Sequence, residues 1–209
     1  MENHELTERA KAGDPAAQWE LNLRAATATE TTPRSQPLPM RKADRRLLPG
    51  IERRMNMVAD PLRETLRGLA TGKLPWPLYL HGPSGAGKTA AALALCDFAE
   101  SACYSTADDL ADFIMANSAG DVQAEWDRIA GKHLAVLDEI GERQNVGDLA
   151  YRTVKKFADL REGHAARVAI YVSNLSPAEL QELFDDRVAS RMLCGTVFEL
   201  TDKDRRLAR

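Results

Sequence analysis

Long apolar runs and cysteine are both scarce in this sequence. No apolar run approaches the roughly 18 residues that a membrane-spanning helix needs, and the first ten residues are too polar for the core of a signal peptide. The three cysteines, Cys96, Cys103 and Cys194, are spaced neither as a CxxC pair nor as a zinc site. These absences predict a cytoplasmic protein with reduced, buried thiols and no contact with a membrane.

A large net charge of either sign is also missing. The formal net charge is -3 and the pI is about 5.9, so the chain lacks the overall basic character of most nucleic-acid binders. Basic residues are concentrated in one region, and they are Arg34, Arg41, Lys42, Arg45, Arg46, Arg53, Arg54, Arg63 and Arg67. This region is either a solvated linker and helix face or a docking surface for single-stranded DNA or a partner protein.

The chain is long enough for one α/β domain of ordinary size with an extension before it. Residues 1–48 are predicted to form the extension, with two short helices followed by a flexible, exposed, proline-containing linker at residues 27–40. Residues 49–209 are predicted to form the main domain. It begins with apolar residues at helical spacing from Ile51, and Pro61 is expected to kink or split this helix.

The main domain then alternates apolar runs with amphipathic stretches, which is typical of a parallel sheet covered by helices. Five strands are predicted near residues 76–81, 102–105, 133–138, 167–173 and 196–200. Helices are predicted at 87–100, 107–117, 121–130, 144–162, 177–185 and 186–192. The sequence therefore predicts a three-layer α/β/α domain of the P-loop NTPase class.

A glycine-rich loop separates the first of these strands from the helix that follows it. The loop reads Gly82, Pro83, Ser84, Gly85, Ala86, Gly87, Lys88 and Thr89. Its glycines let the backbone aim N–H groups at the phosphates of ATP beside the helix N-terminus, Lys88 is predicted to reach the β- and γ-phosphates, and Thr89 to bind Mg²⁺. The alternative of a chance glycine turn does not explain the complete motif in this context. His81, which ends the strand, is interpreted as structural.

Polar residues end two further predicted strands. Asp138 and Glu139 follow a buried run at the carboxyl edge of the sheet, where Asp138 is predicted to bind Mg²⁺ and Glu139 to activate the attacking water. A solvated acidic turn is the alternative. Asn174 follows another apolar strand and either orients water beside the γ-phosphate or simply forms a turn. A water-activating glutamate favours an ATPase over a small-molecule kinase.

Two arginines near the end of the chain share one face of a predicted helix. Arg187 and Arg191 are four residues apart. They form either a solvated helix face or a source of an arginine finger for the nucleotide of a neighbouring subunit.

Three motifs together resemble the AAA+ ATPases of the DnaC-type replicative helicase loaders and the related IstB-type transposition helpers. They span residues 137–141, 172–176 and 186–192, and the similarity extends over roughly residues 50–206. The resemblance implies a sheet ordered 5-1-4-3-2, no full helical lid after the last strand, and a homo-oligomer whose active site is completed in trans. It also implies that Asn174 is sensor 1, that Arg191 is the finger, and that Arg205 or Arg206 is sensor 2.

By this resemblance the chain is expected to hydrolyse ATP weakly alone and faster with a partner. The partner would be a replicative helicase or another DNA-processing protein, which makes a helicase loader the leading prediction and a transposition helper the closest alternative. A P-loop small-molecule kinase and a nucleotide-binding module with almost no turnover are alternatives from other classes.

Overall fold

The computed structural model describes residues 36–39, 55–141, 147–162 and 167–201. All of them belong to the second of two compact units, residues 33–209. The helices predicted in the first 30 residues lie outside the described part. Within the described part, no helix has the length and apolar character needed to cross a membrane.

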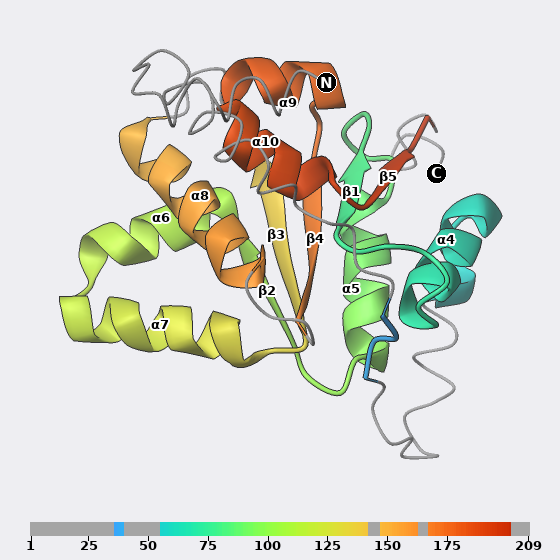
Figure 1. Ribbon diagram of the computed structural model, residues 1–209, viewed down its shortest axis with the longest axis horizontal. Helices are drawn as coiled ribbons and strands as arrows, with labels where there is room; N and C mark the ends of the chain where they lie inside the picture. Colours follow the sequence, from blue (N-terminus) through green and yellow to red (C-terminus); the bar gives the residue numbers. More distant parts are fainter. Residues whose placement is uncertain (1–35, 40–54, 142–146, 163–166, 202–209) are drawn as a thin grey trace, which may run out of the picture. The chain divides into compact units, whose positions relative to one another are not determined.

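Five parallel strands form one sheet in the order β2-β3-β4-β1-β5 (Figure 1). Their bounds are β1 (Leu78–His81), β2 (Ala102–Thr106), β3 (Leu134–Ile140), β4 (Val168–Ser173) and β5 (Thr196–Glu199). All five predicted strands are confirmed, and the order equals the predicted 5-1-4-3-2 sequence counted from the opposite edge. Strand β3 is longer than predicted, because it continues past Asp138 to Ile140.

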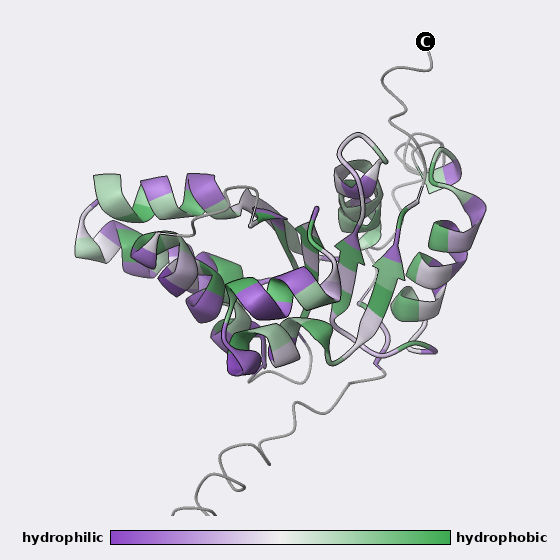
Figure 2. Cartoon of the chain, turned by 90° about the horizontal axis from the view of Figure 1, so that it is seen from above, coloured by the Kyte–Doolittle hydropathy of each residue, from purple (hydrophilic) through white to green (hydrophobic). Residues whose placement is uncertain are grey.

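Helices cover both faces of this sheet, so the predicted three-layer architecture is confirmed. On one face lie α4 (Asp60–Ala70) and α5 (Lys88–Phe98). On the other lie α6 (Ala107–Ala116), α7 (Ala119–Gly131), α8 (Asp148–Glu162), α9 (Pro177–Leu183) and α10 (Asp186–Leu193). Successive strand residues point to opposite faces, and Figure 2 shows the hydrophobic colour concentrated on the strands between the helices.

Side chains cap the N-termini of α6, α7, α9 and α10. The side chains of Thr106, Ser118 and Asp185 each accept a hydrogen bond from the first turn of the helix that follows, and Ser176 forms a capping box with Glu179. The predicted break at Pro61 is confirmed, since α4 begins at Asp60 and the proline occupies its first turn.

Residues 36–39 pack against the end of the core that lies away from the strands' carboxyl edge. Leu38 is 2% exposed, and its backbone N–H donates to the carbonyl of Ala70 over 3.0 Å. The backbone N–H of Glu100 donates to the carbonyl at the end of the segment over 2.8 Å. The prediction of an exposed linker is therefore wrong for Leu38, because its apolar side chain is buried and backbone hydrogen bonds hold this segment against the core, whereas Pro37 is exposed as predicted.

Arg161, near the end of α8, fastens the same end of the core. Its buried guanidinium donates to the carbonyls of Ile129, Lys132, His133 and Val168 over 2.6–3.1 Å. These carbonyls end α7 and precede or begin β3 and β4. Burial lowers the pKa of Arg161 to about 10, which leaves the side chain charged at neutral pH.

Candidate nucleotide-binding site

A pocket of about 560 Å³ opens at the carboxyl edge of the sheet. It is lined by Ser84, Gly85, Gly87, Lys88, Thr89, Ala90, Leu93, Asp138, Glu139, Ser173 and Asn174. The pocket unites three segments that are far apart in the sequence, namely the glycine-rich loop, the acidic pair and the end of β4. Gly82, Pro83 and Ala86 belong to the loop but do not line the pocket.

The glycines of the loop adopt backbone angles that other residues avoid. The φ values are 135° at Gly82, 78° at Gly85 and 100° at Gly87. A Cβ atom at Gly82 would also lie 2.1 Å from the carbonyl oxygen of Leu200, just after β5. A side chain at Gly82 is therefore disfavoured both by the φ angle and by the backbone of Leu200. A Cβ at Gly87 would meet no atom within 4 Å.

Lys88 connects the loop to the end of β4. Its ammonium donates to the carbonyls of Gly82 and Pro83 over 2.7 Å and 2.9 Å, and to Oδ1 of Asn174 over 2.7 Å. Lys88 is 8% exposed, so a largely buried cation lies at the pocket wall against these oxygen atoms. The ammonium and the predicted polar sensor therefore lie side by side, and both are within reach of a phosphate in the pocket.

Thr89 and Asp138 provide a pair of oxygen atoms suited to Mg²⁺. The Thr89 hydroxyl donates to Oδ2 of Asp138 over 2.7 Å, and the backbone N–H of Glu139 donates to Oδ1 over 2.7 Å. Asp138 is 2% exposed, so the carboxylate is fixed rather than free in solvent. Hydroxyl and carboxylate oxygens beside phosphate oxygens are the ligands that Mg²⁺ prefers, and the residues present fit this ion.

Glu139 has the single positive φ, 59°, found at a non-glycine residue in the described ranges. The pairing of β3 with β4 shifts register between Leu137 and Ile140, around this residue. The side chains of Asp138 and Ile140 are buried while Glu139 is exposed and lines the pocket. A left-handed conformation costs a residue with a side chain about 1–2 kcal/mol, and here it aims the carboxylate at the pocket.

The turn after β4 places Asn174. The hydroxyl of Ser173 donates to the carbonyl of Ile140 over 2.6 Å and accepts the backbone N–H of Leu175 over 3.0 Å. These bonds connect the turn to the end of β3, so the acidic pair and the amide are held relative to each other. The sequence predicted the amide but not the serine that positions it.

Two further residues, His81 and Tyr104, were not among the predicted site residues. His81 is buried and packs against the ring of Tyr79 at a centroid distance of 5.6 Å, and burial lowers its pKa. It does not line the pocket, which agrees with the structural interpretation. Tyr104, on β2, donates its hydroxyl to Asp138 over 3.0 Å. Nothing distinguishes this tyrosine in the sequence, because tyrosine is an ordinary strand residue.

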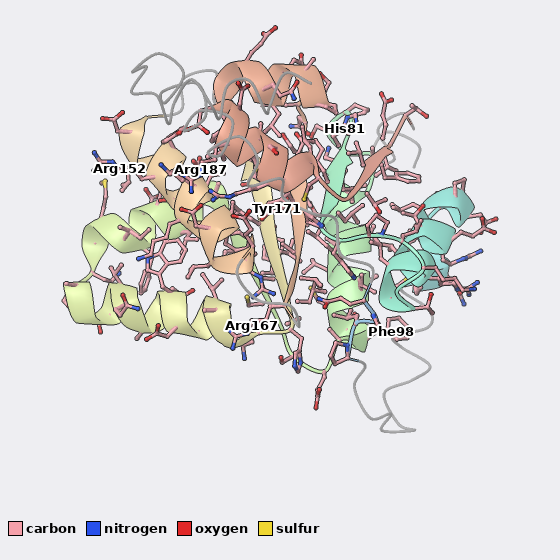
Figure 3. The ribbon with its side chains drawn as sticks, in the orientation of Figure 1. His81, Phe98, Arg152, Arg167, Tyr171 and Arg187 are labelled. Carbon is pink, nitrogen blue, oxygen red and sulfur yellow. The ribbon has the colours of Figure 1, made fainter. Side chains whose placement is uncertain are left out.

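The predicted arginines do not converge on the pocket. Arg191 is 8% exposed and pairs with Asp159 and Glu162 of α8, so within the chain it has a structural contact. Arg187 lies exposed on α10 beside α8 (Figure 3). The finger role of either residue stays a prediction. The predicted sensor 2 candidates at 205 and 206 lie outside the described residues.

No protein-family model matches the sequence, and no curated protein matches it either. The fold does match solved structures. A DNA replication initiation factor is 21% identical with a TM-score of 0.58, the match covering 74% of this chain and 51% of that one. The replication initiator DnaA bound to AMPPCP and single-stranded DNA is 24% identical with a TM-score of 0.56, over 68% and 44%.

DnaI is 19% identical with a TM-score of 0.52, and the match covers 79% of this chain and 86% of DnaI. The chain spans about half the length of the initiators it matches. Identities this low establish the fold and leave activity and partners to the site itself. The chain therefore shares its five-stranded parallel α/β fold with the replication initiator DnaA and with DnaI.

Proposed function

We propose that the chain binds ATP with Mg²⁺ in this pocket and hydrolyses it. The observation that carries the proposal is the Thr89–Asp138 hydrogen bond of 2.7 Å at a pocket that also holds Lys88 and Glu139. A phosphate chain needs a cation, backbone donors and a metal site around it, and hydrolysis adds a base for water. The residues that we propose for these roles line one pocket.

The residues divide the chemistry between them. The loop backbone and Lys88 would bind the β- and γ-phosphates, and Thr89 and Asp138 would hold Mg²⁺, which when bound neutralises charge on the phosphate oxygens. Glu139 would orient the attacking water and accept its proton. Asn174, now bound to the Lys88 ammonium, would present its amide to the same water or to the γ-phosphate.

A comparison of two variants tests this function. Lys88→Ala should weaken the binding of a fluorescent ATP analogue strongly while the protein still folds and unfolds cooperatively. Glu139→Gln keeps the size and the hydrogen bonding of the side chain, so ATP should still bind while phosphate release falls by about 10²-fold or more. Unchanged analogue affinity in the lysine variant would refute the assignment of the pocket.

The proposed process is DNA replication, with the chain acting as a DnaC-like helicase loader. The support is the motif resemblance around the acidic pair, the sensor and the helix of Arg187, together with the fold shared with DnaA and DnaI. The partner would be a replicative helicase or another DNA-processing protein, and single-stranded DNA is a second candidate ligand. Capture of a transposase in place of a helicase, with and without ATP, would favour the IstB-like alternative.

We also propose that the active site is completed by a second copy of the chain, with Arg187 as the better finger candidate. Arg187 is exposed on α10, whereas Arg191 is already paired with two carboxylates of its own chain. Mixing Arg187→Ala subunits with Glu139→Gln subunits tests this, because a finger acts across an interface and each variant supplies what the other lacks. Mixtures without activity above the separate variants would refute the shared site.

A small-molecule kinase remains the competing class, and one measurement separates it from an ATPase. An ATPase with Glu139 as its base should release phosphate from ATP in the absence of any acceptor other than water. Phosphate release only in the presence of an added acceptor alcohol would favour the kinase.

A further inference from the structure

Tyr104 lies on β2, the strand next to the one that carries the acidic pair. Residues 102–106 pair in parallel with residues 134–138, and Tyr104 stands opposite Val136. Tyr104 packs with Val136 in the cluster on the α5 side of the sheet, whereas its neighbour Cys103 belongs to the cluster on the other side. Its side chain is therefore on the same face as the phosphate-binding loop and its helix.

From this position the ring reaches diagonally to the end of β3. The Tyr104 hydroxyl donates to Oδ2 of Asp138 over 3.0 Å, and the same oxygen accepts the hydroxyl of Thr89 over 2.7 Å. The other oxygen, Oδ1, accepts the backbone N–H of Glu139 over 2.7 Å. Three donors from three different segments thus fix both oxygens of the carboxylate. Only the tyrosine comes from outside the recognised motifs.

A simpler interpretation is that Tyr104 merely fills a strand position. On that interpretation a phenylalanine would serve equally well, and the hydroxyl of this half-buried tyrosine would face solvent. The hydroxyl instead contacts the buried carboxylate of Asp138. An ionised carboxylate can only accept hydrogen bonds, whereas a phenol has an O–H to donate, and the two oxygens lie 3.0 Å apart. The direction of the hydrogen bond is accordingly settled: the tyrosine donates and the carboxylate accepts.

We propose that Tyr104 is a positioning residue for the Mg²⁺ site, holding Asp138 with Oδ2 toward Thr89. This inference rests on the proposed function and identifies a residue that would affect its affinity for Mg²⁺. Groups that orient a metal-binding carboxylate commonly change metal affinity by about 10- to 100-fold when they are removed. Asp138 keeps two of its three donors without the tyrosine, so the lower end of that range is expected.

The test measures nucleotide affinity against Mg²⁺ concentration, which does not depend on turnover. A fluorescent ATP analogue is titrated into the full chain in EDTA and at a series of Mg²⁺ concentrations. Tyr104→Phe should need about tenfold more Mg²⁺ for half of the affinity gain, while its affinity in EDTA equals that of the wild type. Tyr104→Met, which replaces the ring with a flexible apolar side chain and has no hydroxyl, should behave in the same way.

Tyr151→Phe is the matched control. Tyr151, on α8, also donates its hydroxyl to a carboxylate, that of Asp185, but neither residue lines the pocket. This variant should retain the Mg²⁺ dependence of the wild type. A Tyr104→Phe curve that superimposes on the wild type overturns the positioning role and leaves the proposed function intact. An effect confined to Tyr104→Met also overturns it, because packing of the ring would then be the cause. A wild type whose affinity ignores Mg²⁺ refutes the proposed function itself.

Discussion

Replacing Gly82 with alanine tests whether the phosphate loop is locked against the last strand. Two costs add at this position. A residue with a side chain at φ 135° carries backbone strain of about 1–3 kcal/mol. The new Cβ would also lie 2.1 Å from the carbonyl oxygen of Leu200, a backbone atom that cannot rotate away as a side chain could.

Moving that carbonyl disturbs a second contact. The backbone N–H of Leu200 donates to the carbonyl of His81 over 2.7 Å, so a shift at Leu200 weakens the bond that joins the ends of β1 and β5. Overpacking of this kind costs about 1–3 kcal/mol. We therefore expect Gly82→Ala to lower the free energy of unfolding by about 2–6 kcal/mol, the sum of strain and overpacking.

Gly87→Ala is the matched control, because it shares the positive φ but has open space around the new Cβ. Strain alone should cost it about 1–3 kcal/mol, and the entropy effect of removing a glycine from the unfolded chain is common to both variants. Urea denaturation of the full chain measures the difference. If the two variants differ by about 2 kcal/mol in the free energy of unfolding, and that free energy falls by about 2 kcal/mol per M urea, their midpoints differ by about 1 M. Equal midpoints would refute the locking contact.

Three further predictions concern residues away from the loop. Arg161→Leu leaves four backbone carbonyls without their donor and should lower the free energy of unfolding by about 3–5 kcal/mol, measured in urea; a loss below about 1 kcal/mol would mean that water replaces the guanidinium. Arg191→Ala should cost about 1–2 kcal/mol in the isolated chain, since its two carboxylate partners are partly exposed. If the Arg191→Ala variant kept full stability but lost the ATP hydrolysis that depends on assembly, Arg191 would become the preferred finger candidate. Deleting residues 1–48 should lower the melting temperature more than deleting residues 1–35, because only the longer deletion removes buried Leu38; identical melting curves would contradict this packing.

Much of the fold follows from local sequence patterns. Apolar runs predicted the central strands β1, β3 and β4, because strands buried on both faces consist almost entirely of apolar residues. The partly buried edge strands β2 and β5 were also predicted. Proline and capping residues marked the starts of helices, as at Pro61 and Ser176. The packing of Leu38 escaped prediction, since a short proline-flanked segment has no periodicity and its burial depends on a surface built from distant residues.

The sequence by itself identified the glycine-rich loop and the acidic pair as the candidate site, because the chemistry of each is carried by adjacent residues. Glycines, a lysine and a threonine at fixed spacing specify an anion site wherever a strand precedes them and a helix follows. Only the tertiary structure decided which other side chains contact the residues of that site. The Tyr104 hydroxyl meets Asp138 across two paired strands, and Arg191 is occupied by carboxylates of α8. Such contacts depend on strand register and helix packing, which join residues about 30 positions apart and leave no local pattern in the chain.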